Sequence, residues 1–157
     1  MTKLIFNLSA PMQSYVKKTS SNRQFTEHRP TVSAIVGMLA ASLGYRRGDQ
    51  RITDLYQKLD IYVKDVRTNE LDLIDYQNVH YYKTAPKVPL LGYSGLKQVN
   101  AQVWRSYLQD AKFEIQITGE KDLLEKLQYS LKHPYFALAC GRRSCPPDRP
   151  LDPVLVE

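Results

Sequence analysis

The four residues Gly141-Arg142-Arg143-Ser144 combine side-chain types that bind phosphate. Glycine permits close approach to the backbone, two forked guanidinium groups can clamp phosphate oxygens, and the serine hydroxyl is a further small donor. No Walker-type or dinucleotide fingerprint occurs in the sequence, so nucleotide hydrolysis has no support. The pattern therefore indicates anion binding.

Two further segments have side chains suited to the same ligand. In the segment 10–15, Gln13 and Ser14 can bond to ribose or phosphate and Tyr15 can stack on a base; an ordinary turn is the alternative. Arg46 and Arg47 follow an expected helix, where basic residues equally complement the helix C-terminus. Both interpretations stay open for each segment.

The positive charge is concentrated rather than spread evenly. The chain has 22 basic and 16 acidic residues, a net charge of +6, and residues 1–53 hold eight of the basic residues and two of the acidic ones. The stretch 76–109 has no acidic residue. Cations and rings alternate along this stretch: Tyr76, Tyr81, Tyr82, Lys83, Lys87, Tyr93, Lys97, Trp104, Arg105 and Tyr107. Cations interleaved with rings favour a single-stranded nucleic-acid surface; the alternative is a basic sheet surface with half-buried tyrosines.

The histidines and cysteines do not form a metal-ligand pattern, and we expect no metal and no cofactor. His80 beside two tyrosines and Lys83 is compatible with metal-free RNA cleavage, which needs a positioned base, acid and cation. Cys140 is expected to be a buried thiol and Cys145 a loop thiol.

The composition limits the class of protein. The 157 residues suit one domain, 1–157, and 43% hydrophobic residues permit an ordinary core. No apolar run approaches the ~18 residues of a membrane span, and no apolar leader opens the sequence. Two cysteines cannot build a disulfide scaffold, so we expect a cytoplasmic protein.

Hydrophobic periodicity predicts alternating strands and helices. The expected strands are Lys3–Ser9, Asp60–Arg67, Leu71–Val79, Lys112–Gly119 and a buried Tyr135–Cys140, the second and third being joined by a turn at 68–70. The expected helices follow Pro30-Thr31 up to Gly44, run from a Thr53 cap to Leu59, and cover Glu120–His133. Residues 80–107 fit no regular element, and 146–157 form a short extended Pro-rich tail. The order predicts an α+β, ferredoxin-like (RRM-like) βαββαβ domain.

Several segments together resemble the CasD (Cas-five) family, which supplies a subunit of the type I-E Cascade complex in CRISPR antiviral defence. The matching segments lie in the family's order across residues 3–147: 10–14, Arg23, 30–44, 75–77, 107–113 and 141–147. The sequence departs from the family at Tyr15-Val16-Lys17, where an aromatic-glycine step is usual.

The resemblance implies a RAMP-type fold with an inserted thumb hairpin, which we place at 80–107. It implies a non-catalytic RNA-binding subunit that grips the 5′ handle of the CRISPR RNA (crRNA) and caps that end of the complex. Partners would be CasC-like backbone subunits and a CasA-like large subunit, with target DNA contacted only indirectly and no membrane. Type I-C relatives cleave the precursor RNA, so an endoribonuclease using His80 or His28, a tyrosine and Lys83 stays as the alternative.

We assign twelve RNA-binding candidates from the motifs and the resemblance. Nine are expected along the handle: Gln13, Ser14, Tyr15, Arg23, Arg46, Arg47, Arg142, Arg143 and Ser144. Three are expected in the thumb: Trp104, Arg105 and Tyr107.

Overall fold

The computed structural model describes residues 2–16, 22–69, 72–84 and 96–157, and the side chains of 81–84 and 96–99 lie outside this description. The main sheet has four antiparallel strands in the order β4-β7-β1-β8. They are β1 (Lys3–Ser9), β4 (Asp60–Arg67), β7 (Lys112–Thr118) and β8 (Val154–Val156). The first three lie where alternating apolar residues predict them.

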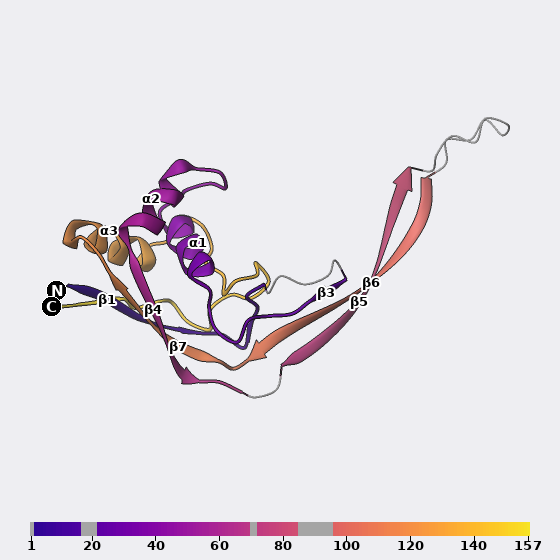
Figure 1. Cartoon of the computed structure of the whole chain (residues 1–157), viewed down its shortest axis with the longest axis horizontal. Helices are drawn as coiled ribbons and strands as arrows, with labels where there is room; N and C mark the ends of the chain where they lie inside the picture. The colour runs from indigo at the N-terminus through magenta and orange to yellow at the C-terminus, as the bar shows by residue number, and fades with distance from the viewer. Residues whose placement is uncertain (1, 17–21, 70–71, 85–95) are drawn as a thin grey trace.

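One face of this sheet forms the core. Leu4, Phe6 and Leu8 of β1 and the alternate residues of β7 are 2% exposed or less, so each strand buries every second side chain. The helices α1 (Val32–Ser42), α2 (Gln50–Lys58) and α3 (Lys121–Lys132) lie on the same side of the sheet (Figure 1). Each large apolar side chain fully buried there contributes about 1.5–3 kcal/mol. The expected α+β composition is confirmed.

The helices α1 and α2 each begin at a residue whose side chain accepts from a free backbone N–H group of the first turn. The Thr31 hydroxyl accepts from the backbone N–H of Ala34 at 3.2 Å and starts α1. The α2 helix starts earlier than expected: its cap is Asp49, whose carboxylate accepts from the backbone N–H of Arg51 at 3.0 Å, and not Thr53. Thr53 lies inside the helix because Asp49 already supplies the acceptor.

A long hairpin projects away from the helices (Figure 1). Its strands β5 (Leu73–Thr84) and β6 (Leu96–Gln109) pair in register from Leu73 opposite Tyr107 to Thr84 opposite Leu96. The expectation of no regular element in 80–107 is therefore wrong outside 85–95, which the structure does not describe. The two strands expected around the 68–70 turn do not pair with each other, since β4 pairs with β7 and β5 with β6.

Two short strands join the base of the hairpin to the body. The antiparallel strand β2 (Met12–Gln13) pairs with the end of β6, and the parallel strand β3 (Arg23–Gln24) pairs with β6 at Trp104 and Arg105. The segment after β1 therefore fixes the hairpin strand that carries the thumb candidates.

The stretch 135–140 is not the buried strand that its apolar residues predict. The backbone N–H groups of Tyr135 and Phe136 donate to the carbonyls of Ser42 and Ala41, at 3.0 and 3.2 Å. These bonds satisfy carbonyl groups at the C-terminal end of α1 that have no partner within the helix. The segment therefore pairs with the end of α1 and not with a neighbouring strand. The remaining sheet edge is filled by β8, which lies in the expected tail and pairs Leu155 with Leu4.

Candidate nucleic-acid interface

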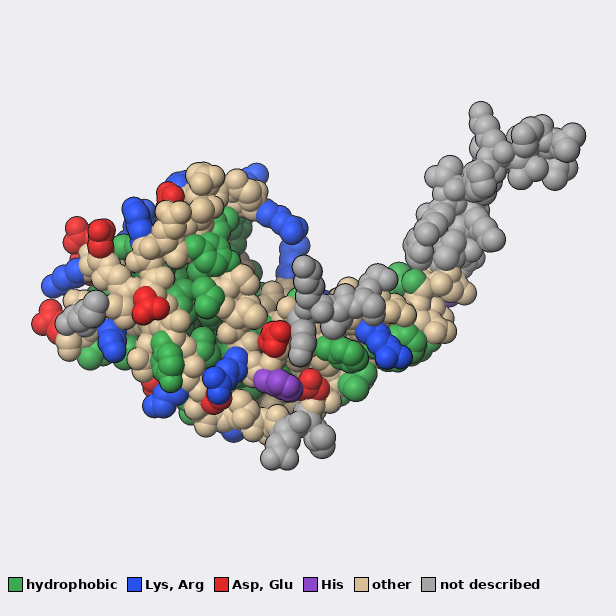
Figure 2. Space-filling view, viewed as in Figure 1, with side chains coloured by type: hydrophobic (Ala, Val, Ile, Leu, Met, Phe, Trp, Pro, Cys, Tyr) green, Lys and Arg blue, Asp and Glu red, His purple; other side chains and the backbone are tan. Residues whose placement is uncertain are grey.

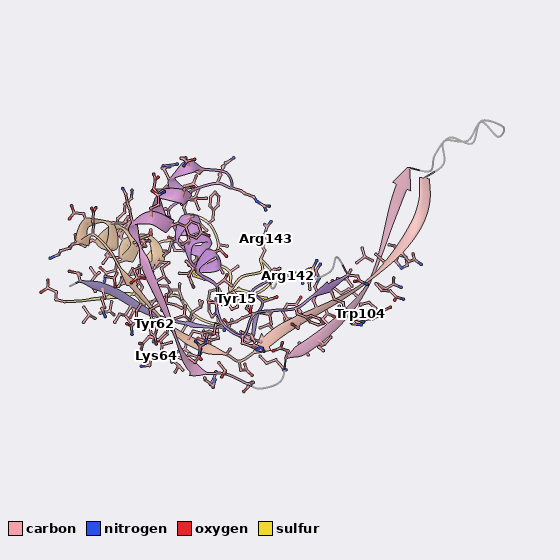
Figure 3. The ribbon with its side chains drawn as sticks, viewed as in Figure 1. Tyr15, Tyr62, Lys64, Trp104, Arg142 and Arg143 are labelled. Carbon is pink, nitrogen blue, oxygen red and sulfur yellow. The ribbon has the colours of Figure 1, made fainter. Side chains whose placement is uncertain are left out.

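A hollow of about 290 Å³ opens where the hairpin meets the body. Its walls come from segments that are distant in the sequence: the turn after β1, β3, the start of α1, β6 and the segment before Cys145. The lining residues are Ser14, Tyr15, Val16, Gln24, Phe25, Thr31, Ser33, Ala34, Arg105, Gly141 and Arg142. Two of the predicted arginines, Arg105 and Arg142, are thus brought to one hollow. Figure 3 shows Arg142 beside Tyr15 at the base of the hairpin.

Neutral groups hold both arginines of the hollow. Arg142 donates from Nη1 to the hydroxyl of Tyr107, which is 4% exposed. Arg105 donates from Nη1 to Oε1 of Gln24 and from Nε to Oε1 of Gln77, the latter at 3.2 Å. Neutral acceptors orient a guanidinium group without cancelling its charge, so both cations stay available to an anion.

Carboxylates do not neutralise these cations within the part of the chain that the structure describes. The ion pairs found there join other basic residues to acids, among them Arg29–Asp65, Arg51–Asp49 and Arg149–Asp148. Asp75 lies opposite Arg105 in the strand register, yet its carboxylate accepts from the Gln77 amide at 2.7 Å. The hollow therefore keeps a positive potential, which favours a polyanion.

Gly141 brings its own segment against the turn after β1. Ser14 forms a parallel bridge with Gly141, and the N–H of Ser14 donates to the carbonyl of Cys140 at 3.2 Å. Gly141 has a φ of +83°, and a Cβ there would lie 1.9 Å from the Ser14 carbonyl oxygen. Only glycine fits this contact, which sets the direction in which Arg142 leaves the backbone.

Gln13, Ser14 and Tyr15 lie below the surface of the hollow. The Gln13 amide donates to the carbonyl of Ala111 at 2.6 Å, and the Tyr15 hydroxyl donates to Oε1 of Gln13 at 2.6 Å. Burial raises the pKa of the Tyr15 hydroxyl, so it remains a neutral donor. The Tyr15 ring is 1% exposed, so the expected stacking on a base is not open to it. These residues support the floor instead.

Trp104 and Arg105 lie on opposite faces of the hairpin, because neighbouring residues of a strand alternate. The Arg23 guanidinium lies 5.9 Å from the centre of the Trp104 ring, and the centre of the Tyr76 ring lies 5.2 Å from the same point. Arg23 is on β3 and Tyr76 on β5, the two strands that pair with β6 at Trp104. Tyr76 is 51% exposed. Arg23, Trp104 and Tyr76 therefore form a surface of one cation and two tilted rings that is separate from the hollow, and Figure 3 shows Trp104 out along the hairpin.

The other basic candidates surround the opening between the helices and the base of the hairpin. Arg46 and Arg47 are exposed in the loop between α1 and α2, and Arg143 and Ser144 are exposed after Gly141. Figure 3 shows Arg143 pointing toward the loop between α1 and α2. Basic side chains border this opening in the space-filling view (Figure 2).

The twelve candidates do not include Gln24 and Gln77, which orient Arg105, or Tyr76, a ring noted in the sequence that extends the Trp104 surface. Each acts through the strand register between β3, β5 and β6. The absence of acids and the many aromatic residues in 76–109 indicated that this region binds nucleic acid. They did not indicate which residues contact Arg105 and Trp104.

The two histidines of the nuclease alternative have separate surroundings. Nδ1 of His80 lies 2.6 Å from Oδ1 of Asn100 across the hairpin, while His28 lines a different hollow with Arg29 and Asp65. The side chain of Lys83 lies outside the description. Among the described residues there is no group of three His, Cys, Asp or Glu side chains that could hold a metal.

Both cysteines are buried: Cys140 as expected, and Cys145 although it lies in the expected loop. Burial raises the pKa of Cys140 to about 12 and also raises the pKa of Cys145. Thiols in this state are poor nucleophiles at neutral pH, which gives them a structural role.

Across the described residues, the helices lack the length and apolar character needed to span a membrane.

The α+β body with its projecting hairpin is a fold shared with chains of CRISPR complexes. The chain matches a solved chain of a "CRISPR RNA-guided surveillance complex" with a TM-score of 0.71 and 28% identity over 93% of this chain and 60% of that one. A type III-B Cmr-beta complex bound to cognate target RNA contains a chain with a TM-score of 0.55 and 13% identity over 98% of this chain and 60% of that chain, a likeness of fold alone.

The family model described as "CRISPR-associated protein (Cas_Cas5)" matches residues 3–157. The chain is 33% identical to the "CRISPR system Cascade subunit CasD" of Escherichia coli (strain K12), covering 94% of this chain and 68% of that protein. The chain therefore belongs to the Cas5 family of CRISPR-associated proteins. It spans about three fifths of the length of the solved relatives.

Proposed function

We propose that this Cas5-family chain is a non-catalytic, RNA-binding subunit of a type I-E Cascade complex that grips the 5′ handle of crRNA and caps that end of the assembly. One observation carries the proposal: Arg105 and Arg142, from distant segments, line one hollow and are held there by neutral partners. Cations kept uncompensated at a concave surface are suited to a phosphate backbone.

The strand order supports the expected ferredoxin-like, RAMP-type architecture. A sheet ordered β4-β7-β1-β8, with α1 and α2 after β1 and α3 after β7, matches a βαββαβ arrangement. The hairpin of β5 and β6 is the natural candidate for the thumb, with its base at 73 and 109 rather than 80 and 107.

The two faces of the hairpin suggest how the RNA is held. Phosphates would lie along the hollow and the basic opening, where Arg105, Arg142 and Arg143 give most of the affinity. The Trp104 surface would stack on an unpaired base where the thumb bends the guide. Gln13, Ser14, Tyr15 and Tyr107 would act by holding the hollow in shape, and Arg23, Arg46, Arg47 and Ser144 by direct contact.

The partners follow from the family. The likeness to a chain of an RNA-guided surveillance complex supports assembly with CasC-like backbone subunits and a CasA-like large subunit, and target DNA would be met through the crRNA. His80 bonds to Asn100 on the hairpin and His28 lines a different hollow, so the two histidines of the nuclease alternative have separate surroundings.

The test compares Arg142→Ala/Arg143→Ala with wild type in binding a 5′-handle RNA at several salt concentrations. We expect weaker binding and a smaller salt dependence, because fewer phosphates are neutralised. The matched control is Arg149→Ala, an exposed arginine that pairs with Asp148 outside the hollow. Equal affinity of the double variant and wild type from low to high salt would overturn the site.

The same RNA, incubated with wild type in EDTA, tests the absence of catalysis. Intact RNA that is shifted on a gel is the expected result. Specific cleavage that is lost in His80→Ala would establish the nuclease instead.

A further inference from the structure

A second groove, of about 560 Å³, runs along α1 beside the hollow. It is lined by Ala34, Gly37, Met38, Ala41, Phe136, Ala137, Leu138, Ala139, Gly141, Arg143 and Pro146. Ala34 and Gly141 belong to both the groove and the hollow. A strand bound in the hollow can therefore continue into the groove without leaving the protein surface.

Gly37 lies in the middle of α1 and is exposed, and neither its backbone nor its packing explains why it is glycine. The positive-φ glycines are elsewhere in the described chain, and a Cβ at Gly37 would meet no atom within 4 Å. Glycine destabilises a helix interior relative to alanine. Glycine at this exposed position lowers the stability of the helix and has no role in the fold. We therefore expect that a group outside the chain approaches the helix backbone there.

The groove has the chemistry of a nucleotide site. Its floor is the apolar surface of α1, and one wall is the ring of Phe136, held edge-on by Tyr135 at 4.8 Å between ring centres. Arg143 is the charged lining residue, and the lining contains no acid. An apolar cleft with one guanidinium group suits a planar base attached to a phosphate, and its volume lies in the range of small-ligand sites.

We infer that this groove is a nucleotide subsite on the path of the bound RNA. One unpaired base lies over Gly37 between α1 and Phe136, and the phosphate of that nucleotide binds Arg143. The inference rests on the proposed function, since it extends the same RNA from the hollow into the groove.

Gly37→Leu tests the subsite because the added side chain extends into the groove from a Cβ that meets no atom within 4 Å. Gly37→Ala is the small-volume comparison, and Gln57→Leu on exposed α2 is the matched control for adding a leucine. The full chain of each variant is titrated with handle RNAs that each lack the base of one nucleotide. Thermal melting verifies that all variants fold.

We expect one abasic RNA to bind wild type about tenfold more weakly. Gly37→Leu should bind intact RNA about tenfold more weakly and show no further loss with that abasic RNA, because both changes remove one contact. Gln57→Leu should bind as wild type does, and the affinity of Gly37→Ala should lie between those of wild type and Gly37→Leu, because its Cβ takes part of the space over the helix backbone.

Each other result has a defined meaning. Failure of wild type to bind handle RNA would overturn the proposed function itself. Wild-type binding by Gly37→Leu, or equal additional losses with every abasic RNA, would overturn the base subsite and leave the proposed function standing. If Gly37→Leu bound RNA as wild type does but no longer co-purified with the other subunits, the groove would hold a protein segment and not a nucleotide. That result would also overturn the inference.

Discussion

The α-carbon of Gly141 packs on the main-chain carbonyl of Ser14 so closely that a Cβ would lie 1.9 Å from the oxygen. Gly141→Ala must therefore separate the two segments, and the left-handed φ of +83° adds backbone strain. We expect a loss of stability of about 2–4 kcal/mol and of most RNA affinity, since Arg142 follows the displaced residue. Denaturant unfolding and RNA titration measure the two effects.

Gly48→Ala is the control for that experiment. Gly48 has a φ of +88° but no atom within 4 Å of an added Cβ, so it carries the strain without the collision. We expect a loss of about 1 kcal/mol with unchanged RNA binding. Equal losses at the two positions would show that the contact with Ser14 is unimportant.

Trp104→Ala and Arg105→Ala should weaken RNA binding in different ways, because the two side chains lie on opposite hairpin faces. Loss of Trp104 removes stacking, worth about 1–3 kcal/mol per base, and should leave the salt dependence unchanged. Loss of Arg105 should reduce the slope of log affinity against log salt by about one. Titrations at four salt concentrations separate these outcomes, and identical slopes for both variants would contradict the two-face assignment.

Asp75 is expected to lower RNA affinity through its charge. It lies opposite Arg105 and bonds to Gln77, which also holds Arg105. Asp75→Asn keeps the shape and removes the negative charge, so binding should tighten about two- to fivefold at low salt and less at high salt. Asp54→Asn on α2 is the control, and weaker binding by Asp75→Asn would mean that the carboxylate positions Arg105.

The two central strands of the main sheet, β1 and β7, could be predicted from the sequence because each has one buried face. Lys3–Ser9 and Lys112–Thr118 alternate apolar and polar residues for that reason; the first has its expected bounds, and the second ends one residue before the expected Gly119. Only the first part of the hairpin was expected as a strand, Leu71–Val79, and its further course was not, since Tyr76 and Val79 are exposed on two different faces and the hairpin has no single buried face. The three-residue β8 is too short for periodicity to reveal.

The candidate site was predictable by residue type but not by arrangement. Arg142 and Arg105 stand out in the sequence as cations in segments without acids. Their convergence depends on the bridge between Ser14 and Gly141 and on the pairing of β3 with β6, which are long-range contacts. The burial of Tyr15 follows from the same contacts, so an apparent stacking residue became part of the floor.

Stability should fall at alkaline pH because of two buried groups beneath the hollow. Burial raises the pKa of Cys140 from 9.0 to about 12, and it raises the pKa of Tyr15 above its ordinary 10.0. Since the unfolded chain loses these protons first, the stabilisation is complete below pH 9 and declines as pH rises through the folded-state values. Each group contributes up to about 1.4 kcal/mol per pH unit in that range. Melting temperatures from pH 7 to 11 should fall less steeply in Cys140→Ala than in wild type, while Tyr129→Phe, 68% exposed, should follow wild type. An identical alkaline decline in Cys140→Ala and wild type would show that the thiol is not held protonated by the fold.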